Sequence, residues 1–339
     1  MWSARKWLLA LLLLALICSC QRGRAPEKPA PPSEAEQTRL FLESNETRFQ
    51  LARARATGWL DRLTVDPLEL REHGIKGKKK LAELVDSYCI LHNAAPPAEK
   101  SRLMDRLRQV AAVTYEPRYH DMATVNDHEF KEDSTSYLRV AYLMDRHGLD
   151  IALYREEIKK VQPRLDAHLA TRGSHQLMAF HWYYQYFGLT EPFDLASGFE
   201  KGVIKSRLPV EQYTYEKAYA LTHEIFVPYH YGEDLDADFF SAEDKAYLRP
   251  VLEKLTAQYI QKGDPDLTGE LVISLRYLKF SDGAIYRDAL EYLLSAQRPD
   301  GSWGDYEDLR PRFGDYVQQG FYLHTTYVAV NALVMAFAK

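Results

Sequence analysis

The sequence has few cysteines, no stripe of basic residues and, after its first residues, no long apolar run, and each of these features argues against a class of protein. It contains 3 cysteines among 339 residues, and because Cys18 and Cys20 stand near the start, Cys89 is left alone and no disulfide within the folded part is expected. Lysine and arginine form no basic stripe and the formal net charge is -5, which argues against a nucleic-acid partner. After Ile17 no run approaches the length of a membrane-spanning helix, so residues 37–339 alone are expected to be soluble.

The first residues have the composition of an export signal. Arg5 and Lys6 precede an apolar stretch, 7–17, that is too short to cross a bilayer comfortably. The segment ending at Cys20 resembles a bacterial lipobox, which implies that residues 1–19 are a signal peptide and that Cys20 is the lipidated first residue of the mature protein. An ordinary cleaved signal and an uncleaved anchor are the alternatives.

The resemblance to lipoproteins also implies a location. A membrane-anchored protein of the bacterial cell envelope is expected, carrying a lipid such as palmitate. Gln21, rather than Asp, follows the lipidated position, and by resemblance this favours the outer membrane. Residues 20–36 are rich in Pro, Ala and Glu and cannot bury much apolar surface, so they are expected to form an extended tether. Residues 37–339 then form a single domain.

That domain is expected to be all-helical, because apolar residues recur at helical spacing and no run alternates as a strand does. The pattern breaks at Gly, Pro and polar clusters into repeated helical hairpins. Six pairs are predicted: 37–60 with 79–92, 98–113 with 136–146, 150–161 with 176–187, 192–202 with 213–227, 242–261 with 267–279, and 284–296 with 322–337.

The last pair is the most informative part of the chain. Residues 284–296 have one apolar face, whereas from 328 to 338 only Asn331 is polar, so the second helix should be buried on all sides. Between them a Pro-Asp-Gly turn ends the first helix. Trp303 can then fold back onto the helix end, where Gln297 can bridge backbone groups. A half-buried helix followed by a buried one is the repeating unit of a double ring.

Two segments carry a family resemblance. QRPDGSW at 297–303 resembles the QW repeat of terpene cyclases, and YLHTT at 322–326 is similar to a segment of protein prenyltransferase β subunits. Both families are α/α toroids, so the resemblance, which covers residues 263–339, implies an (α/α)6-like toroid with an inner ring of parallel helices and an outer ring. A fold of this kind does not determine which reaction a protein catalyses.

Parallel inner helices place their amino-terminal ends, and the loops before them, at one mouth of the ring. Helix dipoles make that mouth the default site. His324, in the first turn of the last inner helix, matches the zinc-binding histidine of prenyltransferase β subunits by resemblance. No Cys follows Cys89, so the family's thiolate ligand is missing, and Asp266 and Glu270 stand at the corresponding helix start. A tentative divalent metal site of Asp266, Glu270 and His324, with zinc as the metal, is one hypothesis.

Acid–base chemistry without a metal is the other hypothesis for these residues. The candidate catalytic residues are Glu270, His324 and His223. The candidate substrate-binding residues, near the starts of other inner helices, are His175, Tyr213, Tyr215 and His128. Ordinary capping explains acidic groups at helix starts equally well, and a lone His on an apolar helix such as His223 is commonly a hydrogen-bonded core residue.

One acidic run invites a further interpretation. Asp234, Asp236 and Asp238 alternate as in a calcium loop or an acidic cyclase motif, but Phe239 and Lys245 stand where a calcium loop needs Gly and Glu. A solvated helix start is therefore predicted.

The functional hypothesis is an envelope enzyme of the hydrolase or lyase type, acting on a small or oligomeric ligand such as a sugar. The alternative is a non-catalytic ligand-binding or assembly module of the cell envelope.

Overall fold

The computed structural model describes residues 31–63 and 75–337, and in those ranges its regular secondary structure is helical, with no strand. The all-α prediction is confirmed. The chain divides into Met1–Ser33 and Glu34–Lys339, and the description below concerns the second unit. The expected signal peptide, Cys20 and residues 20–30 of the tether lie outside the described residues, whereas residues 34–36 of the predicted tether already belong to the first helix.

Helices are present at eleven of the twelve predicted segments, and two of their bounds differ clearly: α6 begins at Asp127 rather than 136, and α7 ends at Leu169 rather than 161. The longer helices are α2 (Glu34–Leu60), α4 (Ile75–Ala94), α5 (Pro97–Ala112), α6 (Asp127–Arg146), α7 (Ala152–Leu169), α8 (Ser174–Phe187), α9 (Tyr215–Phe226), α10 (Ala242–Lys262), α11 (Pro265–Tyr277), α12 (Ala284–Ser295) and α14 (Leu323–Phe337). The shorter ones are η1 (Val113–Tyr115), η2 (Ala196–Lys201), η3 (Val210–Gln212), η4 (Val227–Gly232), η5 (Glu307–Leu309), α13 (Arg310–Phe313) and the π-helix η6 (Val317–Tyr322).

The outer helix predicted at 192–202 is wrong, because that region holds only the short 3₁₀ helix η2. Gly198 explains its position: a Cβ there would lie 2.8 Å from the Cβ of Leu177. The missing side chain lets η2 lie against α8 at a distance that an ordinary helix would not reach.

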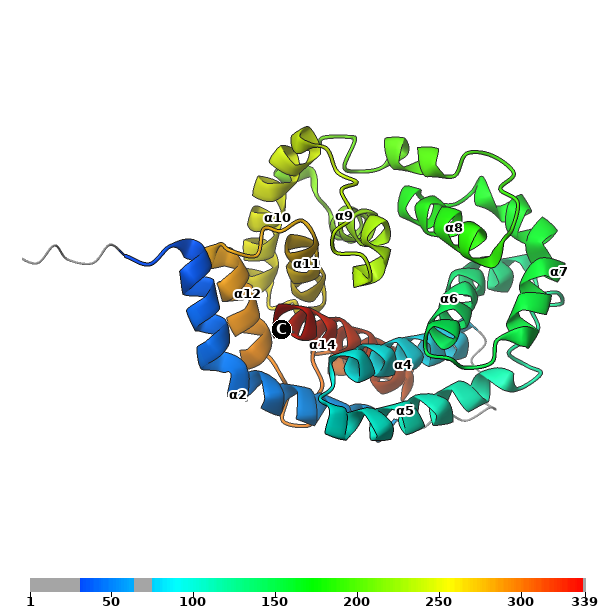
Figure 1. The fold of residues 1–339 in the computed structure, drawn as a ribbon, viewed down its shortest axis with the longest axis horizontal. Coiled ribbons are helices and arrows are strands. Elements are labelled where there is room, and N and C mark those ends of the chain that lie inside the picture. The colour runs from blue at the N-terminus through cyan, green and yellow to red at the C-terminus, as the bar shows by residue number, and fades with distance from the viewer. Residues whose placement is uncertain (1–30, 64–74, 338–339) are drawn as a thin grey trace, which may run out of the picture. The chain divides into compact units, whose positions relative to one another are not determined.

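Six helices make a closed cycle of contacts. In order around the cycle they are α4, α6, α8, α9, α11 and α14, and α14 contacts α4 again (Figure 1). The remaining long helices pack on the outside of this set: α5 on α4, α7 on α6, α10 and α12 on α11, and α2 on α12 and α14. The cycle brings together side chains that are more than 200 residues apart in sequence.

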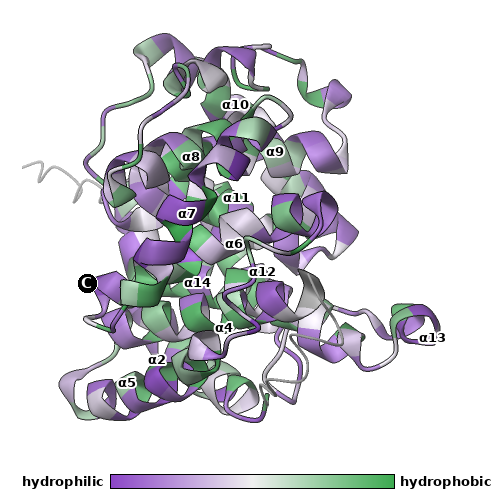
Figure 2. Ribbon diagram, turned by 90° about the vertical axis from the view of Figure 1, so that its right-hand side faces the viewer, coloured by the Kyte–Doolittle hydropathy of each residue, from purple (hydrophilic) through white to green (hydrophobic). Residues whose placement is uncertain are grey.

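The most apolar helix of the described chain is also among the most buried. Val317–Phe337, which joins η6 to α14, is the one described segment long and apolar enough to cross a membrane, and 78% of its apolar window is buried within the protein. α14 packs against α11, α4 and α2, and apolar ribbon concentrates in these inner helices in Figure 2. No residue of α14 is exposed, but the stripe of His324, Tyr327, Asn331 and Met335 is only half-buried, so the helix is buried on all sides but one.

The turn before this helix has the predicted contacts. Trp303 is fully buried, and its indole N–H donates to the carbonyl of Leu293 in the last turn of α12 at 2.8 Å. The amide of Gln297 donates to the carbonyls of Ala52 and Gly301, at 2.9 and 3.1 Å. Gly301 has φ +101°, a left-handed conformation that glycine adopts readily. The turn thus ties α12 to α2 and positions the entry to α14.

Candidate functional site

A cavity of about 200 Å³ lies on the inner side of this cycle. Five of the six cycle helices line it, α11 being the exception, together with η4. Engineered cavities of about 150 Å³ hold benzene, so this space fits a ligand, or one unit of a ligand, the size of a single ring. The side chain of Lys79 is 53% exposed and marks the open end of the cavity.

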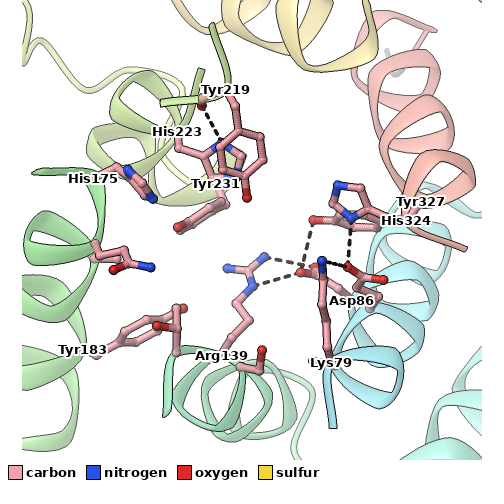
Figure 3. Close-up of a pocket in the computed structure, with 16 residues that line it drawn as sticks. Lys79, Asp86, Arg139, His175, Tyr183, Tyr219, His223, Tyr231, His324 and Tyr327 are labelled. Atoms are coloured by element: carbon pink, nitrogen blue, oxygen red, sulfur yellow. Dashed lines mark hydrogen bonds and ion pairs between the residues drawn. The ribbon is translucent and has the colours of Figure 1, made fainter. Parts of the chain in front are cut away.

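The lining follows helical periodicity. On α4, Lys79, Glu83 and Asp86 recur every three or four residues and so share one face, and His324 and Tyr327 do the same on α14 (Figure 3). Each helix turns its polar stripe to the cavity and its apolar faces to its neighbours. Polar groups therefore enter the cavity beside a larger share of apolar lining.

His324 is held between two carboxylates. Its Nδ1 lies 2.8 Å from Oε1 of Glu83, and its Nε2 lies 3.6 Å from Oδ1 of Asp266. Burial alone would lower the pKa of His324, but attraction to Asp266 and Glu83 outweighs burial and raises it to about 9. Lys79 lies 3.6 Å from Glu83 and, although burial opposes it, lowers the pKa of that carboxyl together with His324. His324 therefore carries a proton at neutral pH.

Asp266 is not the helix cap that its position at the start of α11 suggests. Asp264 is the N-cap, since its carboxylate accepts the backbone N–H groups of Asp266 and Leu267. Asp266 is instead free to face His324, and its other oxygen accepts a hydrogen bond from Tyr215 at 3.2 Å. Tyr215 itself is 47% exposed, so this candidate lies outside the cavity and contacts it only through Asp266.

Glu270 occupies a different place from the one expected. It is 2% exposed and accepts a hydrogen bond from Thr222 at 2.5 Å, and it lies behind the cavity wall rather than in it. Burial and the nearby Asp266 raise its pKa to about 8, against the lowering effect of Thr222. Its carboxyl is 3.8 Å from Nδ1 of His223. Glu270 therefore lies beside His223 and does not line the cavity, where contact with a substrate was predicted.

Two further histidines line the side of the cavity opposite His324 (Figure 3). Nδ1 of His223 lies 2.9 Å from the carbonyl oxygen of Tyr219, so the proton is on Nδ1 and Nε2 is an acceptor. Burial and the neighbouring His175 lower the pKa of His223. Burial also lowers the pKa of His175 to about 4, and the two rings are 5.4 Å apart. Both histidines are neutral at neutral pH.

The centre of the cavity holds an ion pair that the sequence did not point to. Arg139 donates from Nε and Nη2 to the two carboxylate oxygens of Asp86, each at 3.0 Å, and Tyr327 donates to the same carboxylate at 3.2 Å. The ring of Tyr231 lies 4.6 Å from the guanidinium carbon. His230 and Tyr231 have φ of 48° and 55°, an uncommon conformation for such residues, and this kink in η4 brings Tyr231 to the cavity.

The remaining candidates are not brought to the cavity. The hydroxyl of Tyr213 pairs with that of Tyr247 at 2.8 Å, and His128 is exposed in the first turn of α6. Among the acidic residues before α10, Asp236 and Asp238 have side chains 97% and 86% exposed and pair with lysines, as a solvated helix start predicts. Convergence of helix starts therefore holds for α8 and α14, which supply His175 and His324, but not for every inner helix.

The tentative metal set does not fit a metal in this arrangement. Within the described ranges no group of three His, Cys, Asp or Glu side chains is placed to hold an ion. Attraction to Asp266 and Glu83 raises the pKa of His324 to about 9, so the imidazole is protonated at neutral pH and has no lone pair for a metal. Glu270 is turned toward Thr222 instead.

Comparison with known proteins gives one match. The family described as a domain of unknown function, DUF6895, matches residues 35–334, which include the whole cavity. No curated protein and no solved structure matches the chain.

Proposed function

We propose, for a chain that belongs to the DUF6895 family, that the cavity is the active site of an acid–base enzyme of the hydrolase or lyase type. Its substrate would be a polar molecule, such as a sugar, with one ring in the cavity. The observation that carries this proposal is that one cavity places the clamped His324 opposite His175 and His223. Groups of one chemical type with different environments divide into an acid and a base.

The two sides would act at different steps. His324, whose Nδ1 stays bound to Glu83, would donate the proton on Nε2 to the leaving-group oxygen, since Nε2 lies 3.6 Å from Asp266 and makes no hydrogen bond to it. On the opposite side, His175, whose ring lies 5.4 Å from that of His223, would accept a proton, from water in hydrolysis or from a C–H group in elimination. Both assignments use protonation states that the groups hold before substrate binds.

The fold proposed for this domain is an (α/α)6-like toroid related to terpene cyclases and prenyltransferase β subunits. Two observations support it: the closed cycle of α4, α6, α8, α9, α11 and α14, and the buried turn at Trp303 with the amide of Gln297 across it. The departure at η2, where an outer α-helix is missing, is a local one.

We also propose that the enzyme is a lipoprotein of the bacterial envelope, anchored through Cys20 in the outer membrane. The sequence before residue 31 carries this part of the proposal. A tether between anchor and domain would let the cavity reach polymers at the membrane surface.

The test is turnover of envelope-type oligosaccharides by the purified full chain and by His175→Gln and His324→Gln. The proposal expects activity in the wild type and a loss of at least about a hundredfold in each variant, the lower range for acid–base catalysis. The melting temperature of His175→Gln should not fall. No turnover by the wild type on any member of a broad panel, together with retained ligand binding, would favour a non-catalytic binding module.

A further inference from the structure

The cavity wall formed by α6 has two polar atoms without a partner. Nη1 of Arg139 and Oγ1 of Thr135 are buried and make no hydrogen bond. Among the buried unpartnered side-chain atoms of the described chain, these are the two whose residues line this cavity. Residues 135 and 139 are one helical turn apart and so present a common face. Buried polar atoms normally have partners, so a pair left open beside a cavity indicates that the partner comes from elsewhere.

The open atoms are donors on a rigid support. Asp86 holds the other edge of the guanidinium, at 3.0 Å for each of two hydrogen bonds, and Tyr231 covers its face. In Figure 3 the third nitrogen points away from Asp86, toward the side of His175 and Tyr183. Because Arg139 is fixed before a ligand arrives, little ordering of this side chain would be needed on binding.

The carboxylates that line the cavity are already engaged. Glu83 faces His324 and Lys79, and Asp86 receives Arg139 and Tyr327. A ligand therefore meets unmatched donors and no unpaired carboxylate among the lining residues. Donors of this kind, one of them charged, are suited to an oxyanion.

We propose that Arg139 and Thr135 bind a carboxylate of the substrate, which makes the substrate a sugar acid or a related hydroxy-carboxylate. This inference rests on the proposed function, because it treats the bound molecule as a substrate. Binding of the carboxylate does not itself require turnover. A carboxylate is chosen over phosphate because the buried open donors are one guanidinium nitrogen and one hydroxyl, which match the two oxygens of a carboxylate.

The experiment is calorimetric titration of the full chain with D-glucuronate, its methyl ester, D-glucose and inorganic phosphate. Saturable binding of D-glucuronate is expected, at least about tenfold tighter than binding of the ester or of glucose. Equal affinity for acid and ester, no binding of D-glucuronate, or tighter binding of phosphate would each overturn the carboxylate assignment.

Variants locate the binding. Thr135→Val keeps shape and removes a hydroxyl that has no partner in the free protein, so it should leave folding intact and weaken D-glucuronate binding by about tenfold. Thr268→Val is the matched control, because the Thr268 hydroxyl is also buried without a partner but does not line the cavity. Equal affinities in the two variants would refute the site. Arg139→Lys, which keeps the charge beside Asp86, should weaken binding at least as much as Thr135→Val.

The outcome can be separated from that of the proposed function. His175→Gln should lower turnover by at least about a hundredfold and retain D-glucuronate binding, since His175 is not one of the two open donors. Binding of D-glucuronate without turnover in the wild type would refute the proposed enzymatic function and support the carboxylate site. Turnover of neutral sugars alone would support the enzymatic function and refute the carboxylate site.

Discussion

Replacing Asp266 by Asn should release the proton of His324. Burial lowers the pKa of this imidazole, and the attraction of Asp266, whose Oδ1 is 3.6 Å from Nε2, is the strongest interaction raising it. In the variant Glu83 alone must offset burial, so the pKa should fall from about 9 toward the ordinary value of about 6.5. Asn has the size of Asp and can still accept the hydrogen bond of Tyr215.

The size of the effect on stability follows from the same numbers. The difference between a pKa of about 9 in the folded state and about 6.5 in the unfolded state corresponds to about 3 kcal/mol. Because the folded pKa is the higher one, this stabilisation is fully present below pH 6.5 and is lost as the pH rises through 9. The variant should lack most of this contribution, so the wild type should exceed it in stability more at pH 6.5 than at pH 9.

The assay is an NMR titration of the His324 ring in the wild type and in Asp266→Asn, with urea denaturation at both pH values. Asp282→Asn is the matched control: it makes the same change at a carboxylate that pairs with Arg249 rather than with His324. A wild-type His324 that titrates below pH 7, or an identical titration in the variant, would refute the carboxylate clamp and with it the assignment of His324 as the acid.

Three other predictions test the base, the fold and the anchor. Between pH 6.5 and 4 the free energy of unfolding of the wild type should fall by about 3 kcal/mol relative to that of His175→Gln. The reason is that burial lowers the pKa of His175 to about 4, so its contribution to stability is present above pH 6.5 and is lost on acidification. Parallel urea melts of the two proteins measure this difference, and superimposable pH profiles would contradict it. Trp303→Ala should cost about 3–5 kcal/mol in denaturant melts, since the indole is fully buried, and a cost below about 1 kcal/mol would contradict its packing role. Cys20→Ala should abolish labelling by a palmitate analogue and move the protein from the membrane to the soluble fraction, and unchanged labelling would remove the lipoprotein proposal.

The helices could be predicted because each has a periodic apolar face that must be buried. The clearest case is α14, where Asn331 is the lone polar residue in the stretch 328–337, and a helix of that composition has to lie inside. The failure at 192–202 has a local cause. Whether a segment forms an α-helix or the 3₁₀ turn η2 depends on how closely Gly198 approaches α8, and that distance is a tertiary property.

Half of the site could be predicted, and the reason lies in the position of its residues. His175 and His324 stand in first turns of inner helices, a position that the sequence marks. Glu83, Asp86 and Arg139 stand farther along α4 and α6, where a polar stripe looks like the solvent face of an amphipathic helix. One feature of the sequence could have identified these residues as candidates. Between Leu81 and Leu91 only Glu83, Asp86 and Ser87 interrupt the apolar and aromatic residues, so the polar stripe there is too narrow for a helix that faces water.

The exchange of Glu270 for Glu83 as the partner of His324 shows what sequence order leaves undetermined. α14 touches both α11 and α4, so either neighbour could supply the carboxylate. The choice depends on how α11 is rotated about its axis. Gly269 sets that rotation: a Cβ there would lie 2.8 Å from Cγ1 of Val328, so α11 turns its small residue to α14. The next residue, Glu270, then points to α9 and meets Thr222, so α11 meets His324 through Asp266 and α4 supplies the second carboxylate, Glu83. A glycine in the helix interface thus contributes to which carboxylates surround His324.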